Sequence, residues 1–241
     1  MNTKALVFAA LLFGATPAMA TSVPLAGCGI NDLGCFEALA TYTGSDHEAT
    51  LTLAITNTSS DGYLTALAFN NPGSNAGSPA ISSVVLSSAP TNFNLLGGPL
   101  FDDGINASPF GQFDIGAASS AGGNLSWQGS GNPSAGLAAG QSGIFSFSLT
   151  GNLLGLTITD FFGSLLNPSA GELSSGPGIG SYGAQVLAVR FRGFACEPEC
   201  EGSDKAYGQV VPIPPALALF LTGLGFVAWF GRRRKPATAA A

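Results

Sequence analysis

Side chains that could act as acids, bases or metal ligands are few in this sequence, and its only histidine, His47, stands between Asp46 and Glu48. In an extended segment successive side chains point to opposite faces, so His47 would point away from both carboxylates. This geometry argues against a compact metal site. A Ser-His-Asp triad would have to use His47, and no Gly-x-Ser-x-Gly elbow accompanies it. We therefore predict an exposed strand edge at His47.

Carboxylates cluster in two other segments, residues 102–106 and residues 197–204, the second of which ends at Asp204. Calcium takes about six to eight oxygen ligands, and neither segment follows the EF-hand spacing. We favour solvated acidic loops, with calcium binding as the alternative. A glycoside hydrolase would draw a catalytic pair from the fourteen acidic residues, yet no spacing singles out a pair. The sequence thus predicts no catalytic residue, no metal site and no cofactor.

The four cysteines fall into two local groups, Cys28 with Cys35 and Cys196 with Cys200. A zinc site is the competing interpretation, but it usually needs C-x₂₋₄-C pairs on both sides, and the spacing here does not supply two. Four cysteines allow three pairings. We favour Cys28–Cys35 and Cys196–Cys200, because each pair closes a short, turn-rich loop. Disulfides in turn indicate an oxidising compartment outside the cytoplasm.

Residues 178–183 match the G-x-G-x-x-G pattern of dinucleotide-binding loops. Phosphate binding at such a loop needs the N-terminus of a following helix, whereas a strand pattern follows here. We therefore interpret this segment as a glycine-rich loop.

The elements that position these residues are predominantly strands. Residues 50–56 and 145–150 alternate hydroxyl and apolar side chains, and residues 185–191 place Leu187 and Phe191 on one face and Arg190 on the other. Alternation of this kind is typical of a strand with one buried face. Further strands are predicted at 36–43, 63–70, 81–86, 92–96, 110–115, 125–128 and 154–159. One or two helical turns are expected at 160–166, with Asp160 as the cap.

Glycine, proline and asparagine clusters separate these segments and act as turns. Short strands at this spacing predict an all-β sandwich, Ig-like or jelly-roll in type, that forms one domain over residues 21–209. No long amphipathic helix is expected in that body.

Charge excludes one class of partner. Of the eight basic residues, only Arg190, Arg192 and Lys205 lie in the body, against all fourteen acidic residues, so its net charge is about −11. Nucleic-acid binding depends on Lys and Arg neutralising phosphates, so we expect no nucleic-acid partner. Arg190 and Arg192 share a strand face, and we expect them to pair with carboxylates of the body.

The first twenty residues predict a secretory signal peptide. Lys4 precedes an apolar stretch, and Ala18 and Ala20 form a small-x-small cleavage site before Thr21. Residues 1–20 would be removed on export.

The C-terminal end has three parts. Val211, Pro212, Ile213 and Pro214 precede an uncharged apolar run over 215–231, which is about the shortest length that spans a hydrocarbon core. Four cations follow, and cations of this kind stay in the cytoplasm. They are Arg232, Arg233, Arg234 and Lys235. We predict one transmembrane helix with the body outside the inner membrane and a cytoplasmic tail over 236–241; an ordinary single-pass anchor is the alternative.

The order of these parts over 210–235 resembles the PEP-CTERM sorting signal of exported proteins from Gram-negative bacteria that make exopolysaccharide. Pro212 and Pro214 match the family's Val-Pro-Glu-Pro signature, whereas Ile213 stands at its acidic position. The resemblance implies processing by an exosortase, a membrane cysteine transpeptidase that would supply the catalytic residues for that step. The order of strands also resembles a body type that recurs among such proteins and has no assigned reaction.

Together these features predict a membrane-tethered surface or matrix protein whose sandwich is a non-catalytic module associated with exopolysaccharide. A secreted carbohydrate-active enzyme is one alternative. Another is carbohydrate or ice binding on a flat face that carries Thr50, Thr52 and Thr56. One such strand is too little for a lattice-matched face, which needs several strands in register.

Overall fold

The computed structural model describes residues 21–97, 104–121, 126–128, 130–164, 167, 171–195 and 202–211. Strands dominate these residues, and the helical segments among them are α1 (Ile158–Phe162) and a 3-10 turn at Pro133–Ala135. The described body is therefore all-β, as the alternating sequence pattern predicts.

One sheet has six strands in the order β16-β1-β2-β3-β12-β5, and all of its pairs are antiparallel. Long runs of alternating burial in β2, β3 and β12 give it one apolar face and one polar face. The strands are β1 (Thr21–Cys28), β2 (Cys35–Gly44), β3 (Glu48–Asn57), β5 (Ile81–Ser88), β12 (Ser142–Gly151) and β16 (Gln209–Val210).

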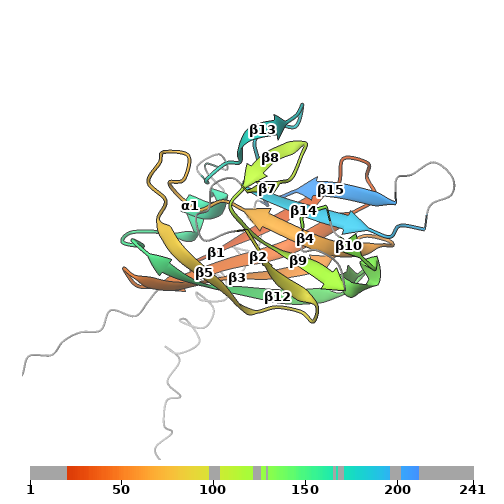
Figure 1. Ribbon diagram of the computed structural model, residues 1–241, viewed down its shortest axis with the longest axis horizontal. Helices are drawn as coiled ribbons and strands as arrows, with labels where there is room; N and C mark the ends of the chain where they lie inside the picture. Colours follow the sequence, from red (N-terminus) through yellow and green to blue (C-terminus); the bar gives the residue numbers. More distant parts are fainter. Residues whose placement is uncertain are drawn as a thin grey trace, which may run out of the picture.

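A second sheet has seven strands, five of them in the order β10-β9-β4-β14-β15 (Figure 1). Of the other two, β6 pairs with β9 and β11 pairs with β4. Nearly every residue of β4 and β14 is buried, which indicates that both faces of this sheet are covered. The strands are β4 (Tyr63–Phe69), β6 (Phe93–Leu96), β9 (Ile115–Ala121), β10 (Ser130–Gly131), β11 (Leu137–Ala138), β14 (Leu187–Arg192) and β15 (Ser203–Tyr207).

The main core lies between these two sheets, so the body is sandwich-like. Phe69 of one sheet meets Phe147 of the other edge-to-face, with ring centroids 5.1 Å apart. Phe161 and Phe162 of α1 pack against Phe69 as well, at 6.2 and 5.9 Å, so the helix closes one end of the core. Aromatic pairs in these orientations add to the stabilisation that comes from burial alone.

A third, three-stranded sheet, ordered β13-β8-β7, covers the outer face of the seven-stranded sheet. That face carries several alanines, including Ala66, Ala68 and Ala188. Their small side chains let Phe110 and Phe113 of the covering layer pack closely. The strands of this layer are β7 (Ile105–Asn106), β8 (Phe110–Phe113) and β13 (Ser175–Ile179). The outer face of the six-stranded sheet carries no such covering layer among the described residues.

Most predicted strands are confirmed to within a few residues. The segments 36–43, 50–56, 63–70, 81–86, 92–96, 145–150 and 185–191 correspond to β2, β3, β4, β5, β6, β12 and β14. The sequence did not indicate β1, because Pro24 stands in its middle and proline is disfavoured inside sheets. Pro24 is tolerated because β1 is almost an edge strand, with only the two residues of β16 on its outer side.

Three predicted strands need correction. Residues 110–115 form two strands separated by Asp114, a buried residue whose carboxylate accepts the backbone N–H of Asn71 at 3.0 Å. The described part of 125–128 is a turn that buries Trp127. Residues 154–159 form a turn, with Gly155 at a φ of 75°, followed by the start of α1.

The predicted helix exists, but it begins earlier than expected. Thr157, and not Asp160, is its N-cap residue. Asp160 stands three residues later, where its carboxylate accepts the backbone N–H of Thr157 at 2.6 Å. This is the reciprocal half of a capping box, so Asp160 does stabilise the helix start.

Candidate functional site

The outward face of the six-stranded sheet carries a regular array of hydroxyl groups. Strand register places Ser22, Thr41, Thr52 and Ser146 in one row across β1, β2, β3 and β12. The hydroxyls of Ser22 and Thr41 are hydrogen-bonded at 3.1 Å. Neighbouring strands lie about 4.8 Å apart, so the row presents closely and evenly spaced hydroxyls.

Parallel rows extend this array. Thr43, Thr50 and Ser148 form the row on one side. On the far side Thr56 and Ser142 stand opposite each other, with their hydroxyls 2.7 Å apart. We call this surface the hydroxyl face; it comprises Ser22, Thr41, Thr43, Thr50, Thr52, Thr56, Ser142, Ser146 and Ser148.

An apolar row runs between these hydroxyl rows. It consists of Pro24, Leu39, Ala54 and Ile144, which are successive register partners. Leu39 and Ile144 are 47% and 57% exposed. A shallow groove of ≈ 450 Å³ follows part of the row and reaches Val211. The surface therefore alternates a strip of hydrocarbon with strips of hydroxyl.

The hydroxyl face carries very little charge. Glu37 shares the row of Thr56, and Glu48 lies at the end of β3; these are the carboxylates that the described strands β2 and β3 turn outward. Hydroxyls donate and accept hydrogen bonds without a net charge. The face can therefore bind a neutral ligand that has both hydroxyl groups and C–H surface, and it offers little for acid–base chemistry.

Only part of this face could be predicted from the sequence. The sequence pattern predicts that Thr50, Thr52 and Thr56 share one strand face, and one such strand is too little for a lattice-matched surface. The structure adds aligned hydroxyls from three more strands. The missing information is register, which depends on pairing between distant segments and on turn geometry. The period-two Ser and Thr pattern of residues 142–150 was the available signal.

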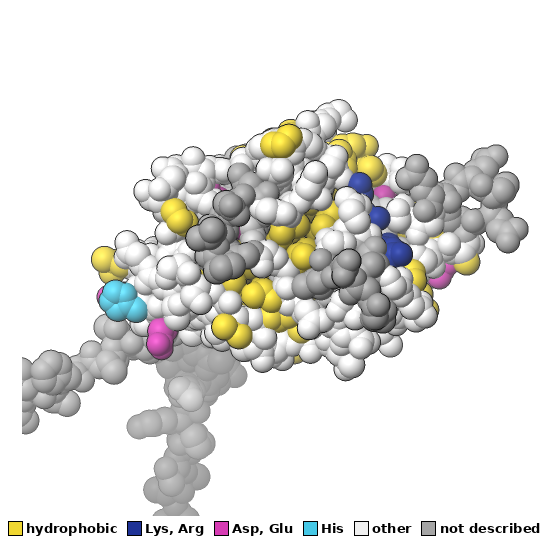
Figure 2. Space-filling model, viewed as in Figure 1, with side chains coloured by type: hydrophobic (Ala, Val, Ile, Leu, Met, Phe, Trp, Pro, Cys, Tyr) yellow, Lys and Arg dark blue, Asp and Glu magenta, His cyan; other side chains and the backbone are white. Residues whose placement is uncertain are grey.

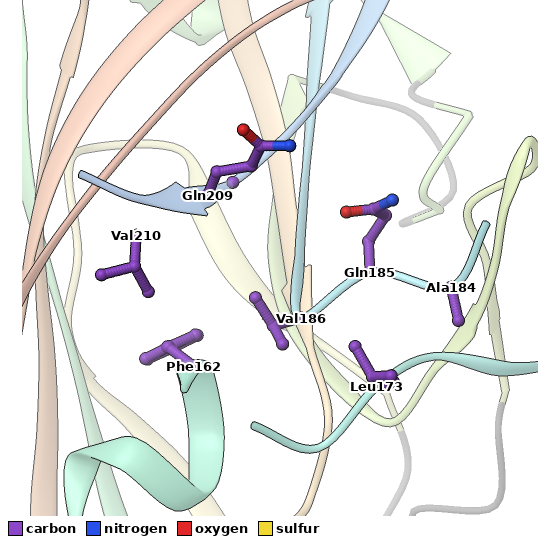
Figure 3. Close-up of a pocket in the computed structure, with 8 residues that line it drawn as sticks. Phe162, Leu173, Ala184, Gln185, Val186, Gln209 and Val210 are labelled. Atoms are coloured by element: carbon purple, nitrogen blue, oxygen red, sulfur yellow. The ribbon is translucent and has the colours of Figure 1, made fainter. Parts of the chain in front are cut away.

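A cavity of ≈ 310 Å³ lies among α1, the segment before β14, and β16 (Figure 3). Phe162, Val186 and Val210 supply its apolar surface, and the amides of Gln185 and Gln209 lie near it. The Gln185 amide donates to the carbonyl oxygen of Tyr182 at 2.6 Å. The lining contains amides and no ionisable side chain, so it suits an uncharged group and not proton transfer.

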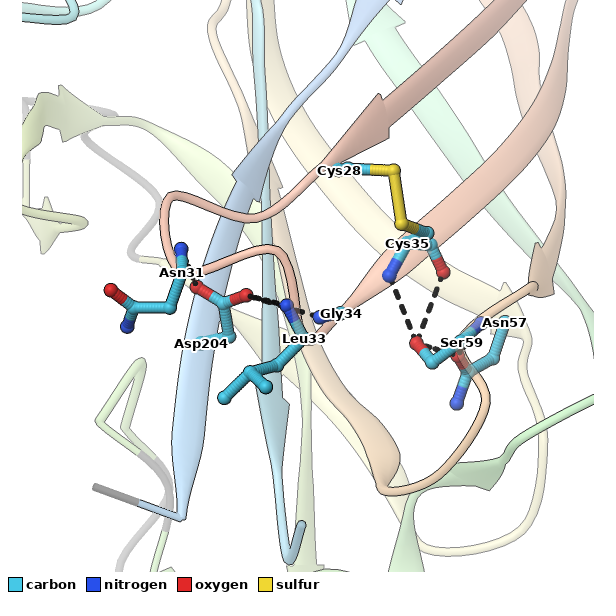
Figure 4. Close-up of a disulfide and its surroundings, with 8 residues drawn as sticks. All are labelled: Cys28, Asn31, Leu33, Gly34, Cys35, Asn57, Ser59 and Asp204. Carbon is cyan, nitrogen blue, oxygen red and sulfur yellow. Dashed lines mark hydrogen bonds between the residues drawn. A yellow bond between two sulfur atoms is a disulfide. The ribbon is translucent and has the colours of Figure 1, made fainter. Parts of the chain in front are cut away.

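The predicted disulfide between Cys28 and Cys35 is confirmed. The two residues are direct register partners at the ends of β1 and β2, and the bond closes the loop that joins these strands (Figure 4). Ser59 stabilises the same corner, because its hydroxyl accepts the backbone N–H of Cys35 at 2.9 Å. Cys196 and Cys200 lie outside the described residues, so their pairing remains a prediction.

Asp204 of β15 holds that loop from the other side (Figure 4). Its carboxylate accepts the backbone N–H groups of Asn31, Leu33 and Gly34 at 3.2, 2.9 and 3.0 Å. Asp204 is only 2% exposed. The expectation of a solvated acidic loop is therefore wrong for this residue, since its oxygens anchor the backbone of a distant segment.

Removing the disulfide should loosen this corner and leave the sandwich folded. For a loop this short, the Cys28→Ser/Cys35→Ser double variant should lose about 2–3 kcal/mol of unfolding free energy in the chain-entropy model. Denaturant unfolding of the purified, oxidised protein measures the loss. The added effect of reductant on the double variant then reports the predicted Cys196–Cys200 bond. Identical stability of variant and wild type would contradict the stabilising role.

The remaining candidate residues do not come together. His47 lies in the turn between β2 and β3, with Nδ1 3.4 Å from the carbonyl oxygen of Gly151. Within the described ranges, no group of three potential metal-ligating side chains forms. The segment 178–183 was interpreted as a glycine-rich loop, but Gly178 belongs to β13 and only the part after Ile179 is a turn. A strand, β14, and no helix follows it, as predicted.

The predicted targeting segments are described only where they join the body. Thr21 begins β1, and Val211 follows β16 and donates its N–H to the carbonyl oxygen of Pro24 at 3.0 Å. The other residues predicted for cleavage, sorting and stop-transfer lie outside the described residues. They are Ala18, Ala20, Pro212, Ile213, Pro214, Arg232, Arg233, Arg234 and Lys235. In the part of the chain that is described, no helix has the length and apolar character needed to cross a membrane.

We compared the chain with known protein families, curated proteins and solved structures. No protein-family model, curated protein or solved structure matches the chain. The functional argument therefore rests on the geometry of its own surfaces and on the sequence of its two ends.

Proposed function

We propose that this chain is an exported, non-catalytic protein that binds exopolysaccharide through the hydroxyl face of an Ig-like or jelly-roll sandwich. Its export rests on the signal-like residues 1–20. Its sorting rests on the tripartite order at 211–235, which resembles a PEP-CTERM signal. On this proposal the tail holds the body outside the inner membrane until an exosortase processes it at Val211–Pro214, and the protein then reaches the cell surface or matrix.

The observation that carries the binding function is the alternation of hydroxyl and apolar rows on a sheet face that no layer of the described residues covers. A sugar ring presents hydroxyls at its rim and C–H groups on its faces. The exposed row of Leu39 and Ile144 suits the C–H surface, because burying apolar area from water is favourable. The flanking rows of Thr41 and Thr52 suit the hydroxyls. A long, flat face also suits a polymer better than a small molecule.

Affinity for a neutral polysaccharide tests this proposal. The exported protein should be retained by insoluble cellulose or by cross-linked dextran. Placing a carboxylate in the central hydroxyl row, as Thr52→Glu or Ser146→Glu, should weaken retention about tenfold, which corresponds to ~1.4 kcal/mol. Ser78→Glu is the matched control, because it adds the same charge in an exposed loop away from the face. Equal retention of all variants would exclude the hydroxyl face as the binding surface.

Ice is the second candidate ligand, and the same rows favour it, because several hydroxyl strands now stand in register. Inhibition of ice recrystallisation by the exported protein, abolished by Thr52→Glu and unaffected by Ser78→Glu, would assign the face to ice. Retention on glucan without any effect on ice would assign it to carbohydrate.

A further inference from the structure

A row of positive charge lies on the opposite side of the sandwich from the hydroxyl face. Arg190 and Arg192 alternate along β14 and share its outer face, and Lys205 of β15 stands directly opposite Arg190. Figure 2 shows the basic side chains of the described residues together in one row. We call Arg190, Arg192 and Lys205 the cation row. They are all the Lys and Arg residues that the described part of the chain contains.

The charge of Arg190 is buried, and no carboxylate from the described residues neutralises it. The side chain is only 7% exposed, and its Nη1 donates to the amide oxygen of Gln128 at 3.1 Å. Its Nε is buried without a hydrogen-bond partner. Among the described residues, an uncharged amide and not the expected carboxylate contacts Arg190. A buried cation is costly unless it is paired and hydrogen-bonded.

The electrostatics of the row agree with this geometry. Burial lowers the pKa of the Arg190 guanidinium, and repulsion from Arg192 lowers it further. Among the described residues, the protonated form therefore has no compensating negative charge. A negative group near the row would offset the repulsion between Arg190 and Arg192, and it would supply acceptors to the more exposed Arg192.

Aromatic and amide side chains surround the row. Tyr207, two residues beyond Lys205 on the same face, packs against the rings of Phe110 and Tyr182 at 5.5 and 6.2 Å. Trp127, next to Gln128, is 3% exposed, and its indole N–H is buried without a partner. Lys205 Nζ donates to the carbonyl oxygen of Ser108 at 2.6 Å, which holds the covering loop beside the row. Rings, amides and cations therefore adjoin one another on this outer face.

We propose that the cation row binds the carboxylate of an acidic sugar in an extracellular polysaccharide. The inference deepens the proposed function and rests on it. Guanidinium groups match carboxylates in two-point contacts, and they are more weakly hydrated than ammonium groups. The body as a whole is strongly acidic, so it repels a dense polyanion at long range. A polymer with isolated carboxylates along a neutral backbone would be attracted by the cation row. It would also be repelled less by the acidic body than a dense polyanion.

A pair of polymers that differ only in charge tests this inference. The exported protein should bind polygalacturonate at least about tenfold more tightly than its fully methyl-esterified form at ~0.1 M salt, where screening acts over about 10 Å. The preference should shrink as salt increases. Arg192→Gln should abolish it, and Arg192→Lys should retain part of it. Arg192 is chosen because it is more exposed than Arg190, so its replacement leaves the buried contact with Gln128 in place.

The outcomes separate this inference from the proposed function. Thr52→Glu should reduce retention on cellulose and leave the preference for polygalacturonate unchanged. Arg192→Gln should abolish that preference and leave retention on cellulose unchanged. Equal affinity for the two galacturonan forms would overturn the inference and leave the hydroxyl face untouched. Thermal stabilisation by inorganic sulfate alone, with none by polygalacturonate, would also overturn it. Loss of stability in Arg192→Gln without any preference in the wild type would mean that the arginines are compensated within the chain.

Discussion

The Asp204→Ala variant should be among the least stable single variants of this protein, with a loss of about 3–5 kcal/mol. Its carboxylate accepts three backbone N–H groups of the loop between β1 and β2, and a fourth from Lys205 at 2.8 Å. A buried donor left without a partner costs about 1–3 kcal/mol, and Gly34 and Leu33 are the least able to regain water. For a domain of this size, the expected drop in melting temperature is about 10 °C.

Two further variants sharpen this test. Asp46→Ala removes an exposed carboxylate and should change stability by less than about 0.5 kcal/mol. Gly29→Ala should also destabilise the protein, because a Cβ at Gly29 would stand 1.9 Å from Oδ2 of Asp204 and displace its carboxylate. If Asp204→Ala unfolds at the same temperature as Asp46→Ala, the loop does not depend on this carboxylate.

The Pro212→Ala/Pro214→Ala double variant should be exported and then persist at the membrane as an uncleaved species. Proline keeps the residue before it extended, and a processing enzyme reads an extended backbone. The apolar run and the basic cluster remain intact, so orientation should not change. Cell fractionation and the mass of the C-terminal peptide measure the outcome.

Removing Arg232 to Lys235 is the contrasting change. Without the cations the apolar run loses its stop, and much of the protein should be released with its tail intact. Normal maturation of the proline variant would mean that the segment is an ordinary anchor. Ile213, at the acidic position of the family signature, would then be the residue that distinguishes this tail from a sorting signal.

The local pattern of the sequence was sufficient for the strands and insufficient for the surfaces that they build. Alternation in residues 50–56 and 145–150 identified β3 and β12, since burial of one sheet face imposes that pattern directly. That Thr52 and Ser146 are partners depends on the pairing of segments nearly a hundred residues apart. The local pattern of Ser and Thr residues does not predict which of them become partners on neighbouring strands.

Charged residues show the same limit. The sequence correctly placed Arg190 and Arg192 together on the outward face of β14, because side-chain direction follows the strand period. It could not identify Gln128 as the partner of Arg190, since a turn and a buried tryptophan bring that amide into place. Asp204 looked like a member of an acidic loop, and only the packing of β15 beside the first hairpin reveals its three distant donors.

The hydrogen bond from Val211 to Pro24 has a consequence for how the domain can be rebuilt. It places the end of the body beside β1, the strand with which the described body starts, so both ends leave from the same edge of the six-stranded sheet. Domains whose ends lie close together tolerate circular permutation. A permuted chain that joins residue 211 to residue 21 through a short linker can be opened at Gly77, where a Cβ would meet nothing within 4 Å. The new chain ends then lie at Gly77, on another part of the surface, while every strand keeps its neighbours.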